Sequence, residues 1–286
     1  MLKYAVIGHP VGHSRSPGMQ NAGFRTCGID AEYLKLEVAP GEFPRYIDFA
    51  VKHLAGFNLT VPHKQMILPY LDGIDPDAKR IGSVNTVKIL PDRKLVGCST
   101  DGVGFEEAVR FKLGMELAGK KCLLLGCGGA ARAVAFRIIG CGAEKLRIAN
   151  RSVGRAEDLA AELGGSAEAF AIGDREKVAA ALQDADLVVQ ATSLGLHAED
   201  APPIDLDLLD GAPEKLAVID LVYLPTPFLK KAAERGLKFC DGSEMLLRQG
   251  AASFRFWTDR EPPLEAMRRG MAESPDAPPF DWRTLA

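Results

Sequence analysis

One segment of the sequence, KKCLLLGCGGAARAVAFRIIG at residues 120–140, constrains the fold more than any other. Its apolar run Cys122–Leu125 is typical of a buried parallel strand, and the glycines behind it stand where a helix begins. In that context Gly126 permits a tight turn, Gly128 lets the backbone approach a pyrophosphate, and Ala131 lets helix and strand pack closely. The segment therefore predicts a dinucleotide-binding unit, with a tight turn that binds nothing as the alternative.

Strand-like and helix-like stretches alternate along almost the whole chain, which indicates an α/β fold with mainly parallel sheets. The expected strands lie at Tyr4–Gly8, Tyr33–Val38, Gly56–Thr60, Val84–Leu90, Lys94–Cys98, Cys122–Leu125, Leu146–Ala149, Leu187–Gln190 and Ala217–Leu221. The expected helices lie at Pro17–Cys27, Pro40–His53, 99–117, Val153–Leu163, 241–257 and Pro263–Met271, besides the one that GCGGAAR opens.

The chain of 286 residues is long for one hydrophobic core, so we expect two domains. We expect a first α/β domain at 1–102 and a Rossmann-type dinucleotide-binding domain at 103–241. Helices at 242–286 are expected to return to the first domain. The proline-rich tail from Ser274 is expected to lie loosely on the surface.

Composition narrows the range of partners to small molecules. A net charge of -3 provides no basic field for nucleic acid or for an anionic membrane. No run of apolar residues is long enough to span a bilayer, and MLKYAVIGHP lacks the features of a targeting peptide, so we expect a cytoplasmic protein. The six cysteines lack CxxC spacing and the five histidines lack ligand spacing, so we expect free thiols and no metal.

The segment NRSVGR, Asn150–Arg155, bears on which nicotinamide cofactor binds. A strand at this place in an NAD-binding unit ends in Asp or Glu, which accepts hydrogen bonds from the ribose hydroxyls. That acid is missing here, and Arg151 and Arg155 instead offer guanidinium groups where the 2′-phosphate of NADP would sit. The pattern favours NADP, unless both arginines are solvated surface residues.

A dinucleotide-binding domain beside a second α/β domain suggests hydride transfer, which requires a group that exchanges a proton with the reacting oxygen. Lys64, in NLTVPHKQ, is a candidate, and Asp101, in GCSTDGVG, could orient it. Lys64 could instead be a solvated residue in the first turn of a helix, and Asp101 a helix N-cap.

The segment GHPVGHSRSP supplies a second polar cluster after the first strand. The hydroxyls of Ser14 and Ser16, together with free backbone N–H groups, could hold a carboxylate. Pro17 suits the first position of a helix, so Ser16 could alternatively be an ordinary N-cap.

Several blocks together extend this interpretation: HSRSP, NLTVPHK, GSVNT, STDGVGF, GCGGAAR, NRS, ATSLG and MLLRQGAASFRFW. In order and spacing they resemble the shikimate dehydrogenase family from Gly8 to about Trp257. The resemblance implies NADPH-dependent, reversible reduction of 3-dehydroshikimate to shikimate, a step of aromatic amino-acid biosynthesis. It implies a substrate-binding first domain. The sequence leaves the choice between a monomer and a homodimer open.

The resemblance also assigns roles to individual residues. It implies Lys64 and Asp101 as the catalytic pair, with Asp101 also among the polar groups around the ring hydroxyls. It implies substrate contacts for the carboxylate-binding pair Ser14 and Ser16, and for Asn58, Thr60, Asn85, Tyr223 and Gln249. It implies cofactor contacts for Gly126, Cys127, Gly128, Gly129, Ala130, Asn150, Arg151, Ser152, Arg155, Thr192, Ser193, Leu221, Gly242 and Met245.

Several positions depart from the family pattern. Ser99 stands where Asn usually precedes the Thr-Asp pair, and His63 and Gln20 are less usual in their blocks. YLPTP at 223–227 is two residues shorter than the common YxPxxTP form. The family also contains quinate-accepting members, some of which prefer NAD, and this alternative stays open. A catalytically silent dinucleotide-binding redox sensor is a further alternative, although such a sensor would not need both Lys64 and Asp101.

Overall fold

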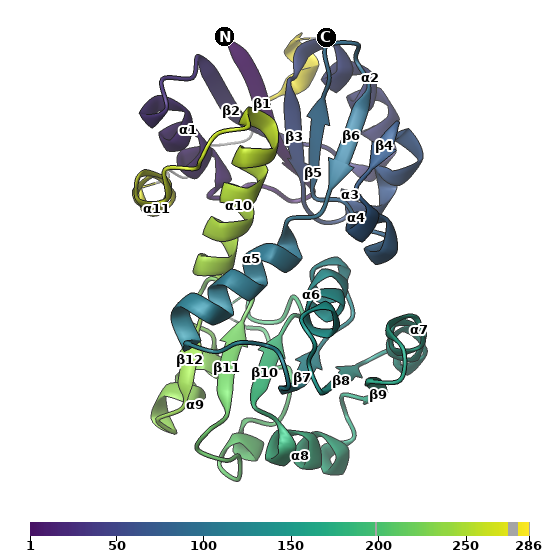
Figure 1. Ribbon diagram of the computed structural model, residues 1–286, viewed down its shortest axis with the longest axis vertical. Coiled ribbons are helices and arrows are strands. Elements are labelled where there is room, and N and C mark those ends of the chain that lie inside the picture. The colour runs from purple at the N-terminus through teal and green to yellow at the C-terminus, as the bar shows by residue number, and fades with distance from the viewer. Residues whose placement is uncertain (198, 274–279, 286) are drawn as a thin grey trace. The chain divides into compact units, whose positions relative to one another are not determined.

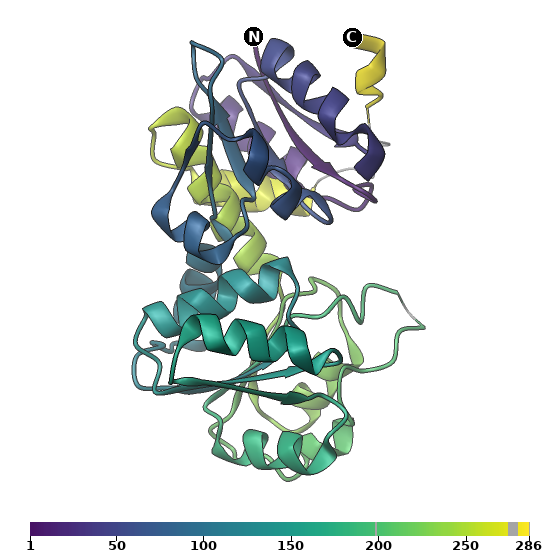
Figure 2. The ribbon, with the colours of Figure 1, turned by 90° about the vertical axis from the view of Figure 1, so that its right-hand side faces the viewer.

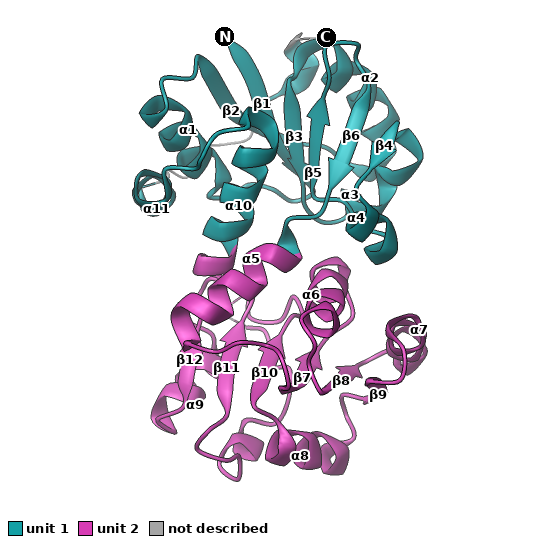
Figure 3. Ribbon diagram, viewed as in Figure 1, with its two compact units in different colours: residues 1–101, 246–286 teal, residues 102–245 magenta. Residues whose placement is uncertain are grey.

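The computed structural model describes residues 1–197, 199–273 and 280–285 (Figure 1). These residues form two compact units (Figure 3). Unit 1 comprises Met1–Asp101 and Leu246–Ala286, and unit 2 comprises Gly102–Met245. The chain therefore leaves unit 1 once, builds unit 2, and returns to unit 1 with its C-terminal segment.

Unit 1 is built on a six-stranded sheet of order β2-β1-β3-β5-β6-β4. Its strands are β1 (Leu2–Gly8), β2 (Ala31–Glu37), β3 (Gly56–Leu59), β4 (Gly73–Ile74), β5 (Thr86–Ile89) and β6 (Leu95–Cys98). Strand β1 pairs in parallel with β2 and β3, whereas β5 runs antiparallel to both β3 and β6. The sheet is therefore mixed. Strands β5 and β6 form an antiparallel hairpin, which the predicted turn at residues 91–93 closes.

Helices cover both faces of this sheet. They are α1 (Ser16–Thr26), α2 (Phe43–His53), α3 (His63–Met66), α4 (Pro76–Ile81), α10 (Ser243–Thr258) and α11 (Leu264–Ala272). One core lies under α2 and contains Tyr46 and Phe57. The other lies under α1, α10 and α11 and contains Phe24, Phe254 and Trp257. The burial of Phe254 and Trp257 holds the C-terminal part of α10 on unit 1.

Unit 2 is a doubly wound unit with a six-stranded, fully parallel sheet of order β12-β11-β10-β7-β8-β9. Its strands are β7 (Lys121–Leu125), β8 (Lys145–Asn150), β9 (Ala167–Ala171), β10 (Leu187–Gln190), β11 (Ala217–Asp220) and β12 (Lys238–Cys240). Its helices are α5 (Asp101–Ala108), α6 (Gly129–Gly140), α7 (Val153–Leu163), α8 (Arg175–Asp184) and α9 (Pro227–Glu234). The first residue of α5, Asp101, still belongs to unit 1.

The side chains of β7 show how unit 2 is layered. Cys122 and Leu124 face the core that contains α6 and α7, and Leu123 and Leu125 face the core that contains α8 and α9. This alternation follows from the two-residue period of a strand and leaves helices on both faces of the sheet (Figure 2). The strand order reverses between β7 and β10, where sheets of this kind bind their ligands.

The structure corrects one predicted helix boundary and adds elements that the sequence pattern did not predict. The helix expected to reach residue 117 ends with a π-helical segment at Val109–Leu113, because Gly114 adopts the left-handed conformation with φ of 62°. The unpredicted elements are β4, α4, β9, α8, α9, β12 and the 3₁₀ segments outside Pro40–His53, and helix α3 was weighed only as an alternative for Lys64.

The predicted loose tail is wrong where the structure describes it. Residues 274–279 lie outside the described residues, but Phe280 forms a β-bridge with Leu36. The side chain of Trp282 is 0% exposed in the core under α2, and its indole N–H donates to the Glu37 carbonyl at 3.1 Å. A single tryptophan in a polar, proline-rich segment produces no periodic pattern, so the sequence did not reveal this anchor.

We expect Trp282→Ala to lower the free energy of unfolding of unit 1 by about 3–5 kcal/mol, since a large buried aromatic side chain is lost. Phe280→Ala is the matched control, because the Phe280 side chain is 39% exposed, and its effect should stay within about 0.5 kcal/mol. Urea denaturation followed by tryptophan fluorescence measures both values, since Trp257, which lies in unit 1, is present in both variants. Equal effects of the two substitutions would contradict the assignment of Trp282 as a core residue.

Candidate active site

Lys64 and Asp101, which sequence reasoning proposed as partners, meet in unit 1. The Lys64 Nζ lies 2.5 Å from Asp101 Oδ2, and the two side chains are 15% and 8% exposed. Lys64 belongs to the short helix α3 behind Pro62, and its carbonyl accepts a hydrogen bond from the backbone N–H of Val84 at 2.9 Å. An ammonium and a carboxylate so poorly exposed to water interact far more strongly than a surface pair.

Asn85 holds the other oxygen of the Asp101 carboxylate. Its amide Nδ2 donates to Asp101 Oδ1 at 2.8 Å, and its Oδ1 accepts the backbone N–H of Thr100 at 2.9 Å. Asp101 is the first residue of α5. Both carboxylate oxygens therefore accept hydrogen bonds from side chains, a role that an N-cap alone does not require.

Asn58, at the carboxyl end of β3, lies in the same buried network. Its amide Nδ2 donates to the Asn85 carbonyl at 3.0 Å and to Thr86 Oγ1 at 2.9 Å. Its Oδ1 accepts the hydroxyl hydrogen of Tyr33 at 2.7 Å. The side-chain amide of Asn58 therefore forms its hydrogen bonds with other groups of the protein, which fixes its orientation and that of the Asn85 backbone.

Ser253 joins this network to helix α10 and was missed by the sequence analysis. Its hydroxyl lies 2.8 Å from Thr86 Oγ1 and 3.2 Å from Thr100 Oγ1, and it donates to the Gln249 carbonyl at 3.0 Å. Asn85 Nδ2 lies 3.3 Å from Gln249 Oε1. The signal in the sequence is helical spacing: a polar residue four positions after Gln249 faces the same side of the helix.

Ser14 and Ser16 come after β1 in the chain, and Thr60 follows β3 directly. Ser16 is the first residue of α1, and its backbone N–H donates to Ser14 Oγ at 3.3 Å; the N-cap position itself is occupied by Arg15. The methyl group of Thr60 packs against Gly8, where a Cβ would collide with it. Because parallel neighbours end at one edge of a sheet, both loops start together above the sheet.

His63 anchors helix α3 from inside. The imidazole is 0% exposed, stacks on Phe43 with ring centroids 4.9 Å apart, and places Nε2 2.7 Å from the Val38 carbonyl. Burial lowers the pKa of His63, because the charged ring would lose its hydration. The histidine beside Lys64 is therefore a neutral packing residue that fixes the position of the lysine.

The glycine loop of unit 2 has the geometry that the sequence predicted. Gly126 has φ of 107°, and a Cβ there would lie 3.0 Å from Thr192 Cγ2 and 3.1 Å from the Ala191 carbonyl. Gly128 is the N-cap of α6, and a Cβ on it would meet nothing within 4 Å. The loop therefore leaves open space at a helix N-terminus, where Gly129 and Ala130 begin the first turn and favour an anion.

Arg151 and Arg155 are exposed at the carboxyl end of β8. Asn150 shapes this turn, because its Nδ2 donates to the Ser152 carbonyl at 2.9 Å. Among the described residues neither guanidinium group forms an ion pair or a side-chain hydrogen bond, whereas Arg132 pairs with Glu162 at 2.8 Å. The Cys127 thiol donates to the Arg155 carbonyl at 3.2 Å and so ties the glycine loop to this turn.

The remaining predicted cofactor residues follow β10 and β11 or precede α10. The Thr192 backbone N–H donates to Gln190 Oε1 at 2.6 Å, and Ser193 follows it. Gly242 packs so closely on the Leu221 carbonyl that no larger residue fits. Tyr223 is half-buried, and Met245 is 6% exposed in the core of unit 2. Met245 thus belongs mainly to the packing of this unit.

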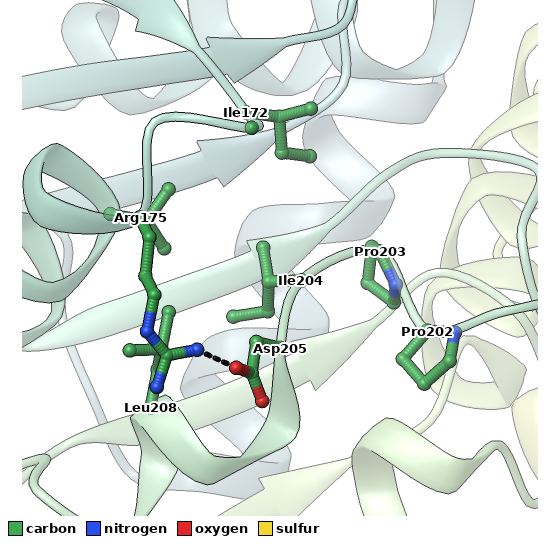
Figure 4. Close-up of a pocket in the computed structure, with 9 residues that line it drawn as sticks. Ile172, Arg175, Pro202, Pro203, Ile204, Asp205 and Leu208 are labelled. Carbon is green, nitrogen blue, oxygen red and sulfur yellow. Dashed lines mark ion pairs between the residues drawn. The ribbon is translucent and has the colours of Figure 1, made fainter.

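A cavity of about 400 Å³ lies elsewhere in unit 2 (Figure 4). Ile172, Pro203, Ile204 and other apolar side chains line it, and Arg175 forms an ion pair with Asp205 at its side. It contains none of the residues predicted from the sequence. We assign it no part in the site.

The described residues contain no cluster of His, Cys, Asp or Glu that could hold a metal ion. No helix in the described part of the chain is long and apolar enough to cross a membrane. All six cysteines are free thiols, and burial raises the pKa of Cys98 and of Cys122 to about 12.

Comparison with known proteins identifies the family. The chain is 42% identical over 276 residues to a protein of Methanopyrus kandleri named shikimate dehydrogenase (NADP(+)), with 94% of each chain covered. The chain belongs to the shikimate dehydrogenase family. A protein of Moorella thermoacetica with the same name is 43% identical over 279 residues, covering 94% of this chain and 92% of its own.

Family models and a solved structure extend this similarity to both units. The shikimate dehydrogenase substrate binding domain matches residues 6–87, shikimate / quinate 5-dehydrogenase matches 107–198, and the shikimate 5′-dehydrogenase C-terminal domain matches 242–269. The crystal structure of shikimate 5-dehydrogenase from Thermus thermophilus in complex with NADP(H) and shikimate has a TM-score of 0.86 at 38% identity. The similarity covers 96% of this chain and 100% of that one.

We expect Ser253→Ala to lower the free energy of unfolding of unit 1 by about 1–3 kcal/mol, because buried polar partners lose a hydrogen bond. Thr258→Val is the matched control on the same helix: its hydroxyl also donates four residues back, to the Phe254 carbonyl at 2.8 Å. Within the described part of the chain that hydroxyl has no partner on the strands, so its loss should cost less. Tryptophan fluorescence in urea reports on unit 1, where Trp257 and Trp282 both lie. Equal losses of unfolding free energy in the two variants would show that the contacts of Ser253 with Thr86 and Thr100 add no stability.

Proposed function

We propose that the protein catalyses the NADPH-dependent, reversible reduction of 3-dehydroshikimate to shikimate, a step of aromatic amino-acid biosynthesis. The observation that carries the proposal is the poorly exposed Lys64–Asp101 pair, 2.5 Å apart in a network of satisfied polar groups. Such a pair holds a proton at a defined atom, which reduction of a carbonyl requires. The named relatives from Methanopyrus and Moorella, and the Thermus complex with NADP(H) and shikimate, support the same reaction.

We assign the substrate to unit 1 and the cofactor to unit 2. Bound NADPH would supply a hydride to the carbonyl carbon, and the carbonyl oxygen would receive a proton to become the hydroxyl. We propose that Lys64 carries that proton at Nζ and that Asp101 orients the ammonium. In the oxidation direction the same group takes the hydroxyl proton as the hydride leaves.

We propose that the polar residues around this pair bind the substrate. Ser14 and Ser16 would bind the carboxylate at the start of α1, and Thr60 would contact the ring hydroxyls. Asn85 and Gln249 would contact ring hydroxyls, since Asn85 Nδ2 donates to the Asp101 carboxylate and lies 3.3 Å from Gln249 Oε1. These contacts are supplemented by the proposed contacts of Asn58 and Tyr223. For Asn58, a substrate contact means exchanging one of its internal hydrogen bonds.

We propose that the cofactor lies over the glycine loop, along the residues that follow β8, β10 and β11. The backbone from Gly126 to Ala130 would hold the pyrophosphate at the N-terminus of α6. The turn from Asn150 to Arg155, including Ser152, would hold the 2′-phosphate, since two exposed arginines stand there and no acid does. Thr192, Ser193, Leu221, Gly242 and Met245 would line the rest of the groove.

Other aspects of the proposal follow from the cysteines and from the family. We propose a cytoplasmic protein, because six free thiols are typical of a reducing compartment. We propose a monomer or a homodimer, which light scattering distinguishes. Quinate remains an alternative substrate, because one matching family model is named for both shikimate and quinate. Turnover assays with shikimate and quinate, each with NADP and NAD, test this choice.

We expect Lys64→Ala to lower kcat for shikimate oxidation by roughly 10²–10⁴, the scale of a positioned acid/base group. Substrate binding should persist, because the serines and amides remain. Lys94→Ala is the control: this lysine also pairs with an aspartate, Asp92 at 2.8 Å, but its side chain is 60% exposed. If the kcat of Lys64→Ala stays within about threefold of the wild-type kcat, Lys64 has no part in proton transfer.

We expect Arg151→Ala to raise KM for NADP by roughly ten- to a hundredfold and to leave KM for NAD almost unchanged. Each charge-assisted contact to the 2′-phosphate contributes about 1.5–3 kcal/mol, and NAD lacks that phosphate. Arg110→Ala, at an exposed arginine of the same unit that pairs with Glu116, controls for loss of charge. Equal loss with both cofactors, or a wild type that uses NAD as well as NADP, would show that Arg151 is only a surface residue.

A further inference from the structure

Two buried polar residues stand side by side at the carboxyl ends of neighbouring strands in unit 2. Gln190 ends β10, Asp220 ends β11, and the two residues are paired in the strand register. Both are 0% exposed. Neither belongs to the residues that the proposed mechanism uses, and burial of a carboxylate is costly, so their presence requires a physical reason.

Each of the two side chains holds the loop that follows its own strand. Gln190 Oε1 accepts the Thr192 N–H at 2.6 Å, and its Nε2 donates to the Leu194 carbonyl at 2.9 Å. Asp220 Oδ1 accepts the Val222 N–H at 2.9 Å, and its Oδ2 accepts the hydroxyl hydrogen of Thr226 at 2.7 Å. In each loop, the buried side chain therefore hydrogen-bonds to one residue near the start of the loop and to another residue further along it.

Thr226 connects the two loops. It is 4% exposed, it is the N-cap of α9, and its Oγ1 also accepts the Leu229 N–H at 3.2 Å. Its methyl group packs against Gly195, which has φ of 99° and could not carry a side chain there without colliding with Thr226. Thr226 thus contacts both loops: the hydrogen bond from its hydroxyl to Asp220 fixes its side chain, and its methyl group then lies against Gly195 in the loop 191–196.

These loops carry Thr192, Ser193, Leu221 and Tyr223, the residues proposed to line the cofactor groove and to contact substrate. The second loop is also the one that is two residues shorter than the family pattern. Within this loop the Thr226 hydroxyl reaches the Asp220 carboxylate, six residues earlier in the chain, directly. We infer that Gln190, Asp220 and Thr226 form a loop anchor that positions the nicotinamide-binding loops for hydride transfer.

The charge of Asp220 is part of this anchor. Burial raises its pKa to about 6, and the Asp241 carboxylate adds to the effect, whereas the Val222 N–H and the Thr226 hydroxyl lower it. Asp200, Asp220 and Thr226 all line one small cavity of about 10 Å³. The Asp200 carboxylate accepts the backbone N–H groups of Gly195 and His197. Above pH 6 the ionised carboxylate accepts both hydrogen bonds strongly, and below that pH protonation removes part of this acceptance.

The inference rests on the proposed function, and the test compares three substitutions in the full-length protein at pH 8 with shikimate and NADP. Thr226→Val, which removes the hydroxyl at constant volume, and Asp220→Asn, which removes the charge, should each lower kcat by roughly tenfold. The dissociation constant for NADP should change by less than about threefold, because the phosphate-binding loops are untouched. Thr226→Ser retains the hydroxyl and should keep kcat within about threefold of wild type.

The control for loss of a helix cap is Asp174→Ala. Asp174 caps α8 of the same unit by accepting the Lys177 N–H at 3.1 Å, so its replacement should lower stability without changing kcat. The ratio of wild-type kcat to Asp220→Asn kcat should fall toward one as pH decreases from 8 to 5, because protonation makes the wild type resemble the variant. Groups common to both proteins cancel in this ratio.

Hydrogen–deuterium exchange at pH 8 gives a readout that does not depend on turnover. Thr226→Val should accelerate exchange in residues 191–196 and 221–226 together, whereas Asp174→Ala should not. The anchor is overturned if kcat of Thr226→Val stays within twofold of wild type, if Thr226→Ser is equally impaired, or if the kcat ratio is flat with pH. If wild type does not turn over shikimate, the proposed function fails, and joint loosening of the two loops alone decides whether the anchor exists.

Discussion

The contact between the poorly exposed Lys64 ammonium and Asp101 carboxylate requires hydrogen-bond partners from several elements of unit 1. Charged groups removed from water need partners for their remaining protons and lone pairs, or their burial destabilises the fold. Asn85 supplies the partner for the second carboxylate oxygen, and Thr100 and Gln249 in turn contact Asn85. This network joins β5, the start of α5 and helix α10, so it requires the C-terminal segment to return to unit 1.

Helix α10 meets this requirement because its two faces differ. Leu247, Ala251 and Phe254 lie in the core with α1, and Gln249 and Ser253 face the polar network. The apolar face provides the hydrophobic stabilisation that holds the helix in place, and the polar face provides directional hydrogen bonds. One helix thus closes the core and completes the surroundings of the lysine–aspartate pair.

The sequence predicted central elements better than edge elements. The bounds of α7, Val153–Leu163, and of β10, Leu187–Gln190, agree with expectation, because this buried central strand is apolar up to its last residue and an amphipathic helix repeats every 3.6 residues. Strands β9 and β12, which were not predicted, form the two edges of the sheet in unit 2. An edge strand is partly exposed, so AEAFA and KFC lack the continuous apolar run that marks a central strand.

The sequence by itself determined the local features of this protein: the glycine turn after β7, the missing acid after β8, and the cation behind Pro62. Each depends on residues close together in the chain, whose geometry follows from local backbone and side-chain rules. Only the tertiary structure decided that Lys64 meets Asp101, 37 residues away, and that Ser253 meets Thr86, 167 residues away. Such contacts depend on strand register and helix packing, which many distant residues fix together and no local pattern specifies.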